Sequence, residues 1–358
     1  DDGLGTGRGP GWALGPAGYT CGFSWAAEGT KGYAPIRHPE SDNFPVENVY
    51  RWYSDLAKSG TRIVFHNGPY DIGWTTAQGC DTPVNIEDTS AAAVMIDENH
   101  RSYSLDACLE REGLPLKNTE LLYEAARAYG GDVKNPKRTI YMYPAKYVGP
   151  YAEDDADRTL DLWRIYEPQL RAQGVWDAYR LEMDLIPVVV EMRRRGIRID
   201  LDLAEQTAEI LEERVKIICS EIGRRVTGMS GRAVTIDDLR SPQWLARAFS
   251  NENLPFPRTP KSGQGSFSKD WMSKSSHWLP RLVVDARHYA DASNKQLRNF
   301  LLSFAHRGRL HAEVHQFKTD EGGTRSQRFS YSSPPLQQME GIEEGPDKKP
   351  VPEGTEPW

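Results

Sequence analysis

Alternating hydrophobic and polar positions near the beginning of the chain predict a β-hairpin. The two alternating runs span residues 19–25 and 32–36, and a turn-like segment with two glycines joins them. A helical pattern follows over residues 46–56, then a strand pattern over 61–65, and a second helix opens within residues 66–71. Strands and helices in this order are typical of an α/β domain.

Farther along the chain, hydrophobic residues recur at the three- and four-residue steps of helices. Residues 86–130 look helical, and another helix is expected from Tyr151 to about Ile165. After Gly174 the pattern indicates long amphipathic helices, followed by two helical segments over 271–281 and 283–305. The clearest helix starts behind the N-cap Asp200 and carries a repeating apolar set, Ala204, Ala208, Leu211, Val215, Ile218 and Ile222.

Composition and charge narrow the classes of protein to which the chain can belong. A chain of 358 residues is long enough for two domains, and no apolar run approaches the length that crosses a bilayer. The net charge of -7 argues against a protein that coats nucleic acid, so any DNA contact must be local. The cysteines lack the spacing of a zinc site, which favours free thiols in a reducing cytoplasm: Cys21, Cys80, Cys108 and Cys219.

The segment Asn67-Gly68-Pro69-Tyr70-Asp71 puts a carboxylate where a predicted strand ends and a helix begins. An α/β sheet exposes functional side chains at such positions, and a carboxylate there can bind a divalent metal ion. A structural interpretation has equal weight, because Asn67 and Asp71 could simply form a turn and cap the helix.

Tyr151 and Asp155 are four residues apart and share one face of a predicted helix. A phenol beside a carboxylate can orient a metal-bound water for attack on phosphorus. The competing interpretation is electrostatic, because acidic residues at the start of a helix complement its dipole. The motif alone does not decide between them.

The two motifs together carry more information, because NxxYD followed by YxxxD resembles the second and third motifs of DnaQ-like 3′-to-5′ exonucleases. Residues 86–89 and 104–106 are also similar to the polymerase-linked members of that family. The resemblance implies an RNase H-like domain that holds two Mg²⁺ or Mn²⁺ ions on four acidic residues. It makes Asp71 and Asp155 metal ligands, Asp71, Tyr151 and Asp155 catalytic residues, and Asn67 and Tyr70 contacts of the single-stranded primer end.

The chain departs from this family at its beginning. No Asp-x-Glu motif precedes the hairpin, and the opening Asp1-Asp2-Gly3 lacks an initiator Met. We therefore expect the first strand of the exonuclease domain to be missing. With two of the four carboxylates absent, we expect the chain to be inactive.

A second resemblance lies near the other end of the chain. Four segments are similar to the part of family-A DNA polymerases that leads from the thumb into the palm: residues 308–311, 315–316, 324–330 and 336–338. In that family the Arg matching Arg328 reaches the minor groove of the primer–template end, with His315, Gln316 and Gln337 expected nearby. Gln327 stands where the family usually has Gly. The alternative is a surface loop with scattered arginines.

Residues 258–263 resemble the thumb-tip loop of the same polymerases. Arg258 and Lys261 would then contact the phosphates of the template and primer. An exposed basic turn with no partner explains the segment equally well.

The chain is identified on these motifs as part of a bacteriophage-type family-A DNA polymerase. We expect a 3′-to-5′ exonuclease-like domain over residues 1–170, a helical thumb-like region over 171–310, and the truncated start of a palm over 311–358. The resemblance implies primer–template DNA, single-stranded 3′ ends and, for the complete parent, dNTPs as partners. It also implies a monomer, no membrane partner, and the cytoplasm of a bacterium or phage-infected cell.

Two other classes of protein stay open. A stand-alone DnaQ-like exonuclease would explain Asn67, Asp71, Tyr151 and Asp155 but not the segment from Thr324 to Gln338. A noncatalytic DNA-binding module would explain the missing carboxylates.

Overall fold

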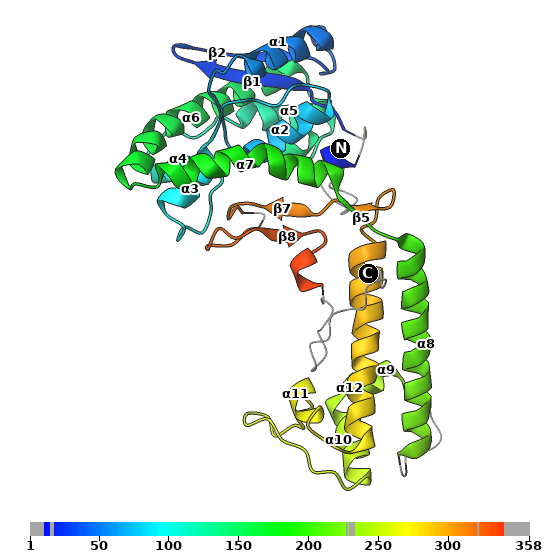
Figure 1. Ribbon diagram of the computed structural model, residues 1–358. Helices are drawn as coiled ribbons and strands as arrows, with labels where there is room; N and C mark the ends of the chain where they lie inside the picture. Colours follow the sequence, from blue (N-terminus) through cyan, green and yellow to red (C-terminus); the bar gives the residue numbers. More distant parts are fainter. Residues whose placement is uncertain (1–10, 15–17, 227, 229–232, 321, 340–358) are drawn as a thin grey trace, which may run out of the picture. The chain divides into compact units, whose positions relative to one another are not determined.

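The computed structural model describes residues 11–14, 18–226, 228, 233–320 and 322–339 (Figure 1). The described residues form two compact units: one contains the chain up to Ile197 together with Arg309–Gln337, and the other contains Arg198–Gly308 and the described residues from Gln338 on. Helices predominate, with short strands in the first unit, so the α/β class is confirmed in its broad form. In this part of the chain no helix combines the length and apolar character that crossing a membrane requires.

The predicted hairpin is confirmed. Strand β1 (Gly22–Ala27) pairs antiparallel with β2 (Thr30–Pro35), in a register that places Ala27 opposite Thr30 across a two-residue turn. Helix α1 (Val46–Lys58) follows at the predicted place. Lys31 on β2 reaches helix α6 (Ala145–Ala172), where its ammonium group lies 2.9 Å from the Asp154 carboxylate.

A parallel pair of short strands follows the hairpin and α1 in the sequence. Strand β3 (Ile63–Phe65) pairs with β4 (Ile86–Asp88), and helix α2 (Gly68–Ala77) lies between them in sequence. The prediction of helix from residue 86 onward is therefore wrong at its start, because all three residues of β4 are buried in the sheet. Beyond β4 the expected helices are present but separated by loops: α3 (Thr89–Ile96), α4 (Leu105–Arg111) and α5 (Glu120–Tyr129).

Helix α6 begins at Ala145, ahead of the predicted start at Tyr151, and it ends at Ala172, beyond the predicted Ile165. The short 3₁₀ helix η3 (Pro136–Met142) precedes it. Both boundaries were wrong because α6 continues through Pro150 and Pro168, which remove backbone donors without ending the helix.

The core of the first unit lies where α3, α6 and α7 (Trp176–Arg195) pack together. Its fully buried side chains include Leu162, Tyr166 and Tyr179, and burial of such groups supplies about 1.5–3 kcal/mol each. Helix α7 ends at Arg195, and Gly196 is its C-cap residue. A Cβ there would lie 2.7 Å from the backbone oxygen of Leu310, and the φ of 64° also favours glycine.

The chain returns to the first unit after the helical unit. The returning segment contains β6 (Arg309–Leu310), β7 (Glu313–His315), β8 (Ser330–Ser332) and the short η5 (Leu336–Gln338), and β7 pairs antiparallel with β8. Phe317 joins the core of the first unit. Asp320 accepts hydrogen bonds from Tyr103 N at 2.9 Å and from the Ser102 hydroxyl.

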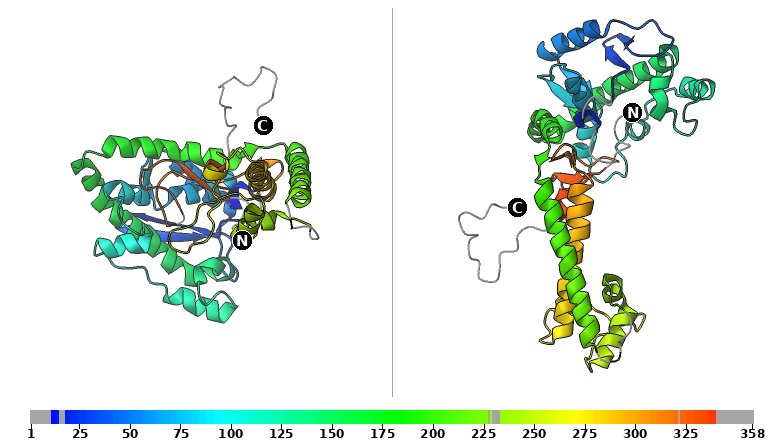
Figure 2. Two further views of the ribbon diagram at one scale, coloured as in Figure 1. Left: turned by 90° about the horizontal axis from the view of Figure 1, so that it is seen from below. Right: turned by 90° about the vertical axis from the view of Figure 1, so that its right-hand side faces the viewer.

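The second unit is helical, as predicted. After the two-residue strand β5 (Ile197–Arg198), Asp200 caps α8 (Leu201–Arg225) by accepting a 2.9 Å hydrogen bond from Leu203 N, which confirms the predicted N-cap. Helix α8 lies beside α12 (Trp278–Asp291) and its π-helical continuation η4 (Ala292–Leu302), as Figures 1 and 2 show. The described residues of this unit also form shorter helices: α9 (Ile236–Arg240), α10 (Pro242–Asn251) and α11 (Lys269–Met272).

The predicted boundaries of the last two helices were wrong. The segment expected over 271–281 is divided between α11 and the start of α12, and α12 runs through residue 282 without a break.

Candidate functional site

The turn that carries the first motif is held in place by Asp88, at the end of β4. One carboxylate oxygen of Asp88 accepts a 2.5 Å hydrogen bond from Gly68 N, and the other caps α3 through Ser90 N at 2.8 Å and Ala91 N at 3.0 Å. A Cβ on Gly68 would lie 3.1 Å from Phe65 and 3.2 Å from Asp88, so this close approach favours glycine.

Asn67 precedes α2 in the left-handed conformation, with φ 69°, and its side chain makes no capping hydrogen bond. Left-handed backbone is uncommon outside glycine, although Asn adopts it more readily than most residues. Asn67 thus occupies the N-cap position that the structural interpretation gave it, but it does not cap the helix through its side chain. Tyr70, in the first turn of α2, is 49% exposed.

Asp71 lies in the first turn of α2, and the residue as a whole is exposed. The protein around it still disfavours the charged form, and this desolvation, together with the negative charges of Asp88 and Asp155, raises the pKa of Asp71 to about 7. Asp155 belongs to α6, so the carboxylates of the two motifs lie close enough for the charge of Asp155 to act on Asp71.

Tyr151 and Asp155 form a pair on α6. The Tyr151 side chain is buried, and burial and the adjacent Asp155 carboxylate raise the pKa of the phenol above its usual range. Because α6 begins at Ala145 and has no acidic residue in its first turn, Asp155 lies too deep in the helix to serve its dipole. The electrostatic explanation of this motif is therefore wrong.

A lysine that the motifs did not indicate completes this cluster. Lys117 Nζ lies 2.7 Å from Asp155 Oδ1 and 3.4 Å from Asp106 Oδ1, and only 6% of the Lys117 side chain is exposed. The contact with Asp155 is an ion pair by distance, although its angles are not those of a hydrogen bond. Lys117 and Lys137 also lie 5.4 and 5.3 Å from the centre of the Tyr151 ring.

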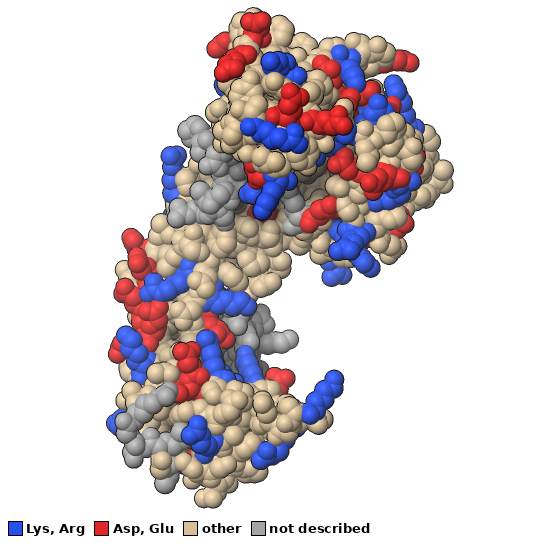
Figure 3. Space-filling model, turned by 180° about the vertical axis from the view of Figure 1, so that it is seen from behind, with Lys and Arg blue, Asp and Glu red and all other residues tan. Residues whose placement is uncertain are grey.

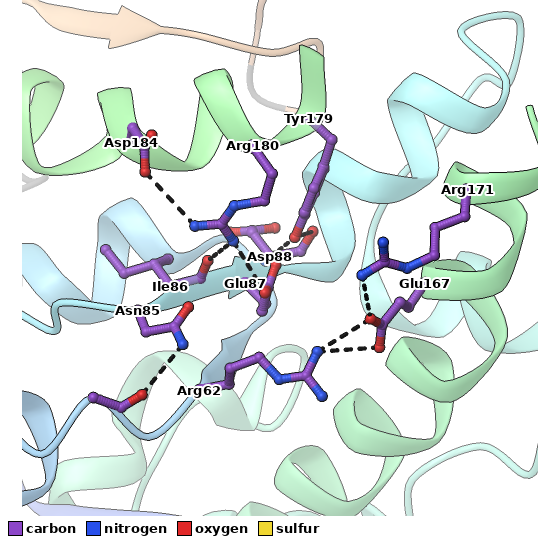
Figure 4. A network of polar contacts seen from close by, with 11 residues as sticks. Arg62, Asn85, Ile86, Glu87, Asp88, Glu167, Arg171, Tyr179, Arg180 and Asp184 are labelled. Carbon is purple, nitrogen blue, oxygen red and sulfur yellow. Dashed lines mark hydrogen bonds and ion pairs between the residues drawn. The ribbon is translucent and has the colours of Figure 1, made fainter. Parts of the chain in front are cut away.

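A network of polar contacts joins β4 to α7 (Figure 4). Tyr179 of α7 accepts a 2.8 Å hydrogen bond from Asp88 N, and Arg180 lies 3.0 Å from the Glu87 carboxylate. Burial raises the pKa of Glu87, while the Arg180 guanidinium opposes this shift. The network fixes β4 to α7 and thereby positions Asp88.

The described residues do not by themselves fit a pair of metal ions. The resemblance implies four acidic ligands, and the candidate set contains two, Asp71 and Asp155. Within the described ranges, no group of three or more His, Cys, Asp or Glu side chains is arranged to hold a metal ion. Asp1 and Asp2 lie outside the described residues.

The candidate thumb-tip residues lie in a closed loop of the second unit. Arg258 pairs with Gly265 in an isolated β-bridge and donates from Nη1 to the Gly263 oxygen at 3.0 Å. Lys261 is exposed at the loop tip. Figure 3 shows basic and acidic side chains interspersed over the visible face, so DNA affinity here would depend on individual contacts.

The candidate residues of the returning segment differ in their exposure. His315 is partly buried, and its Nε2 lies 2.7 Å from the Ser332 hydroxyl; burial and the nearby Arg193 lower its pKa. Gln316 is 3% exposed, and its amide donates to the backbone oxygen of Glu182 at 2.7 Å and to its carboxylate at 2.6 Å. A DNA contact by Gln316 would require these bonds to break.

Arg328 extends from a tight turn on the surface. The Thr324 hydroxyl accepts from Arg328 N at 3.1 Å and donates to Arg328 O at 3.0 Å, which closes the turn. Gln327 has a φ of 53°, the left-handed conformation that glycine adopts most easily. The turn therefore keeps a glycine-like backbone without glycine.

The motifs thus located Asn67, Asp71, Tyr151 and Asp155, but they missed Lys117 and the role of Asp88. Asp88 lies within the segment 86–89 that resembled the polymerase-linked exonucleases, so a signal for it was present. Lys117 has no such signal, because it lies in a loop and its partners Asp106 and Asp155 belong to helices α4 and α6.

Comparisons with known proteins place the chain in a family. No family model matched it. It is 33% identical over 353 residues to a DNA-directed DNA polymerase of Pseudomonas phage M6, which covers 94% of this chain and 51% of the relative. It is 28% identical over 346 residues to the DNA polymerase DpoZ of Acinetobacter phage SH-Ab 15497, covering 89% and 54%. Bacterial DNA polymerases I are among the more distant relatives.

The fold agrees with this relationship. The solved POL domain of Pol1 from M. smegmatis, in complex with DNA primer-template and dNTP, matches with a TM-score of 0.64 at 20% identity, over 91% of this chain and 50% of that one. The chain belongs to the family-A DNA polymerases. The family predicted from the motifs is thus confirmed, and this family-A chain spans about half the length of the curated relatives it matches.

Proposed function

We propose that this chain is the part of a family-A DNA polymerase that holds the primer–template and its single-stranded 3′ end. In this proposal residues 1–170 are a DnaQ-like, RNase H-like exonuclease domain, residues 171–310 a thumb, and residues 311–358 the start of a palm. The parent protein copies DNA from a template and removes misinserted nucleotides.

The observation that carries the exonuclease part is the shared environment of Asp71 and Asp155. The two carboxylates come from α2 and α6, and each motif supplies one of them. Tyr151 lies one helical turn before Asp155, as expected for a residue that orients a nucleophilic water. The hairpin β1–β2 and the parallel pair β3–β4 are separate sheets here, and an RNase H-like sheet would join them through a further strand.

The nuclease chemistry of this family uses Mg²⁺ or Mn²⁺, which supplies an activated water and stabilises the leaving oxygen. The described residues offer two carboxylates for this task, so we assign no catalytic step to them. We expect the chain to bind a 3′ end at this site without cutting it. This expectation favours a DNA-binding role over that of a stand-alone exonuclease.

The DNA-binding part rests on exposed groups in both units. Arg258 and Lys261 extend from the loop of the second unit, and both can meet phosphates. Arg328 lies in a turn that is closed by hydrogen bonds between the Arg328 backbone and the Thr324 hydroxyl. The backbone of this turn therefore loses little conformational entropy when DNA binds. We assign Arg328 to the minor groove of the primer end, with His315 and Gln337 nearby.

Binding to three fluorescent DNAs tests the proposal: a primer–template junction, a blunt duplex and a single strand. We expect the 358-residue chain to prefer the junction over the blunt duplex. Equal affinity for all three would contradict the proposal.

A parallel assay incubates single-stranded DNA with Mg²⁺ or Mn²⁺ and measures trimming. We expect none above background. Robust trimming that disappears in Asp155→Ala would show that the site is complete and that the account of its missing ligands is wrong.

A further inference from the structure

The buried ammonium group of Lys117 stands out in the candidate nuclease site. Lys117 lies in the loop between α4 and α5, and a buried charge is costly unless ionic partners compensate its lost hydration. Asp155 and Asp106, on two different helices, provide that compensation. The next residue fastens the same loop to α6, because Asn118 N donates to the Asp154 carboxylate at 3.4 Å.

The ammonium group also approaches the other residues of the site. It lies 5.4 Å from the centre of the Tyr151 ring, one turn before Asp155. Its charge acts on His66 at the end of β3, where it helps to lower the pKa of the imidazole, after the larger effect of burial. Among the described residues, Asp71 takes part in no ion pair. The Lys117 ammonium group therefore pairs with Asp155 and not with Asp71.

A divalent ion and this lysine would compete for the same atom. Mg²⁺ and Mn²⁺ bind carboxylate oxygens directly, and Asp155 Oδ1 is already 2.7 Å from Lys117 Nζ. A metal ion at that oxygen would also experience repulsion from the ammonium charge at short range.

We propose that Lys117 is a positioning residue that supplies this site with a cation of its own. Its ammonium group holds Asp155 beside Tyr151 and keeps divalent ions away from Asp155 Oδ1. The inference rests on the proposed function in one respect, namely that the site is a nuclease site.

Manganese binding to the 358-residue chain tests this inference, with free Mn²⁺ measured by electron paramagnetic resonance. Lys117→Met keeps the apolar stem and removes the charge, so we expect it to bind Mn²⁺ about tenfold more tightly, or more, than the wild type. Lys117→Arg keeps a cation and should resemble the wild type. The gain should disappear in the double variant Lys117→Met/Asp155→Asn.

Lys137→Met is the matched control. Lys137 is 41% exposed and lies 3.7 Å from Asp106, so this variant removes one charge from the same cluster without freeing Asp155. Its Mn²⁺ affinity should change by less than about threefold, because the more distant, solvated charge is screened. Equal gains in both lysine variants would mean that charge alone matters, which would overturn the proposal.

Three further outcomes would also overturn it: a folded Lys117→Met chain with unchanged or weaker Mn²⁺ binding, a gain that survives Asp155→Asn, or loss of folding. Circular dichroism and thermal unfolding check the last of these in Lys117→Met and Lys117→Gln. If neither neutral variant folds, Lys117 serves the fold instead. The test contains no DNA and the test of the proposed function contains no lysine variant, so each can fail alone.

Discussion

The side-chain amide of Gln337 pairs with both backbone groups of Tyr331, donating to its oxygen at 3.1 Å and accepting from its N–H at 3.0 Å. The amide thereby extends the ladder of β8 in the way that a neighbouring strand would. Gln337 is exposed, but its amide is already hydrogen-bonded to Tyr331, so the proposed contact with the primer end would have to use the remaining capacity of that amide.

Removing this amide should loosen the edge of β8. We expect Gln337→Ala to speed hydrogen exchange at the Tyr331 amide by roughly five- to tenfold, because one net hydrogen bond contributes about 1 kcal/mol. Exchange is measured by NMR or mass spectrometry, and Gln338→Ala, at the next exposed position, is the control. Unchanged exchange at Tyr331 would show that the pairing is not maintained in solution.

The salt dependence of DNA binding should report the phosphate contacts of the second unit. We expect Arg258→Gln and Lys261→Gln each to lower the slope of log K against log salt by roughly one. Lys216→Gln, on α8, is the control because Lys216 is exposed and paired with Glu213. A slope that is the same in all four chains would rule out phosphate contacts at the loop.

Arg328 should act differently from these phosphate contacts. We expect Arg328→Ala to weaken binding to a primer–template junction by about 1–3 kcal/mol and to affect a blunt duplex or single strand less, since minor-groove acceptors are its assigned partners. Arg325→Ala, in the same turn, should weaken all three complexes alike. Equal losses for Arg328→Ala on the three DNAs would exclude the primer-end role.

Asp71 should titrate near neutral pH. Its raised pKa of about 7 is expected as a midpoint in carboxyl-carbon NMR, and Asp155→Asn should lower this midpoint by removing a neighbouring negative charge. Asp81 is the contrasting case, because its hydrogen bond with Lys58 lowers the pKa of that carboxyl. A midpoint for Asp71 near 4 would show that solvent dominates its surroundings.

The same shift predicts how stability depends on pH. A carboxyl with a raised pKa binds its proton more tightly in the folded state, so its contribution is present below about pH 4 and is lost as pH rises to about 7. Relative to Asp71→Asn, the wild type should therefore lose stability between these two values, by an amount that solvent screening reduces. Urea unfolding at both ends of the range measures the difference, and the opposite trend would contradict the sign.

Tyr179 should matter for stability through its hydroxyl. Tyr179→Phe leaves Asp88 N, which is buried, without the acceptor that lies 2.8 Å away, so we expect a loss of about 1–3 kcal/mol. Tyr141→Phe is the control because Tyr141 is 38% exposed. A loss below about 0.5 kcal/mol in urea unfolding would mean that water or another group replaces the hydroxyl.

Local patterns predicted the features that depend on neighbours in sequence. The hairpin follows from alternation around a short turn, and α8 follows from its Asp200 cap and apolar repeat. Tyr151 and Asp155 were found because residues four apart meet on a helix.

Features that depend on distant neighbours could not be predicted in this way. Strand β4 has three residues, two of them acidic, and their polar groups are bonded by residues that are distant in sequence: Arg180 and Tyr179 of α7 and Gly68 N of α2. Lys117 lies in a loop, which has no periodic pattern, and its part in the site depends on contact with Asp155 of helix α6. Sequence spacing carries no information about such contacts.

The contacts of the returning segment have a consequence for synthesis on the ribosome. Tyr103 N meets Asp320 and the Lys318 ammonium group donates to the His100 oxygen, across separations of 217 and 218 positions. The polypeptide around residues 100–104 therefore leaves the exit tunnel long before its partners are translated, and the whole helical unit emerges in between. Such late closure exposes an unfinished surface to chaperones and proteases, and it makes completion of the first unit a post-translational event or one of the last co-translational ones.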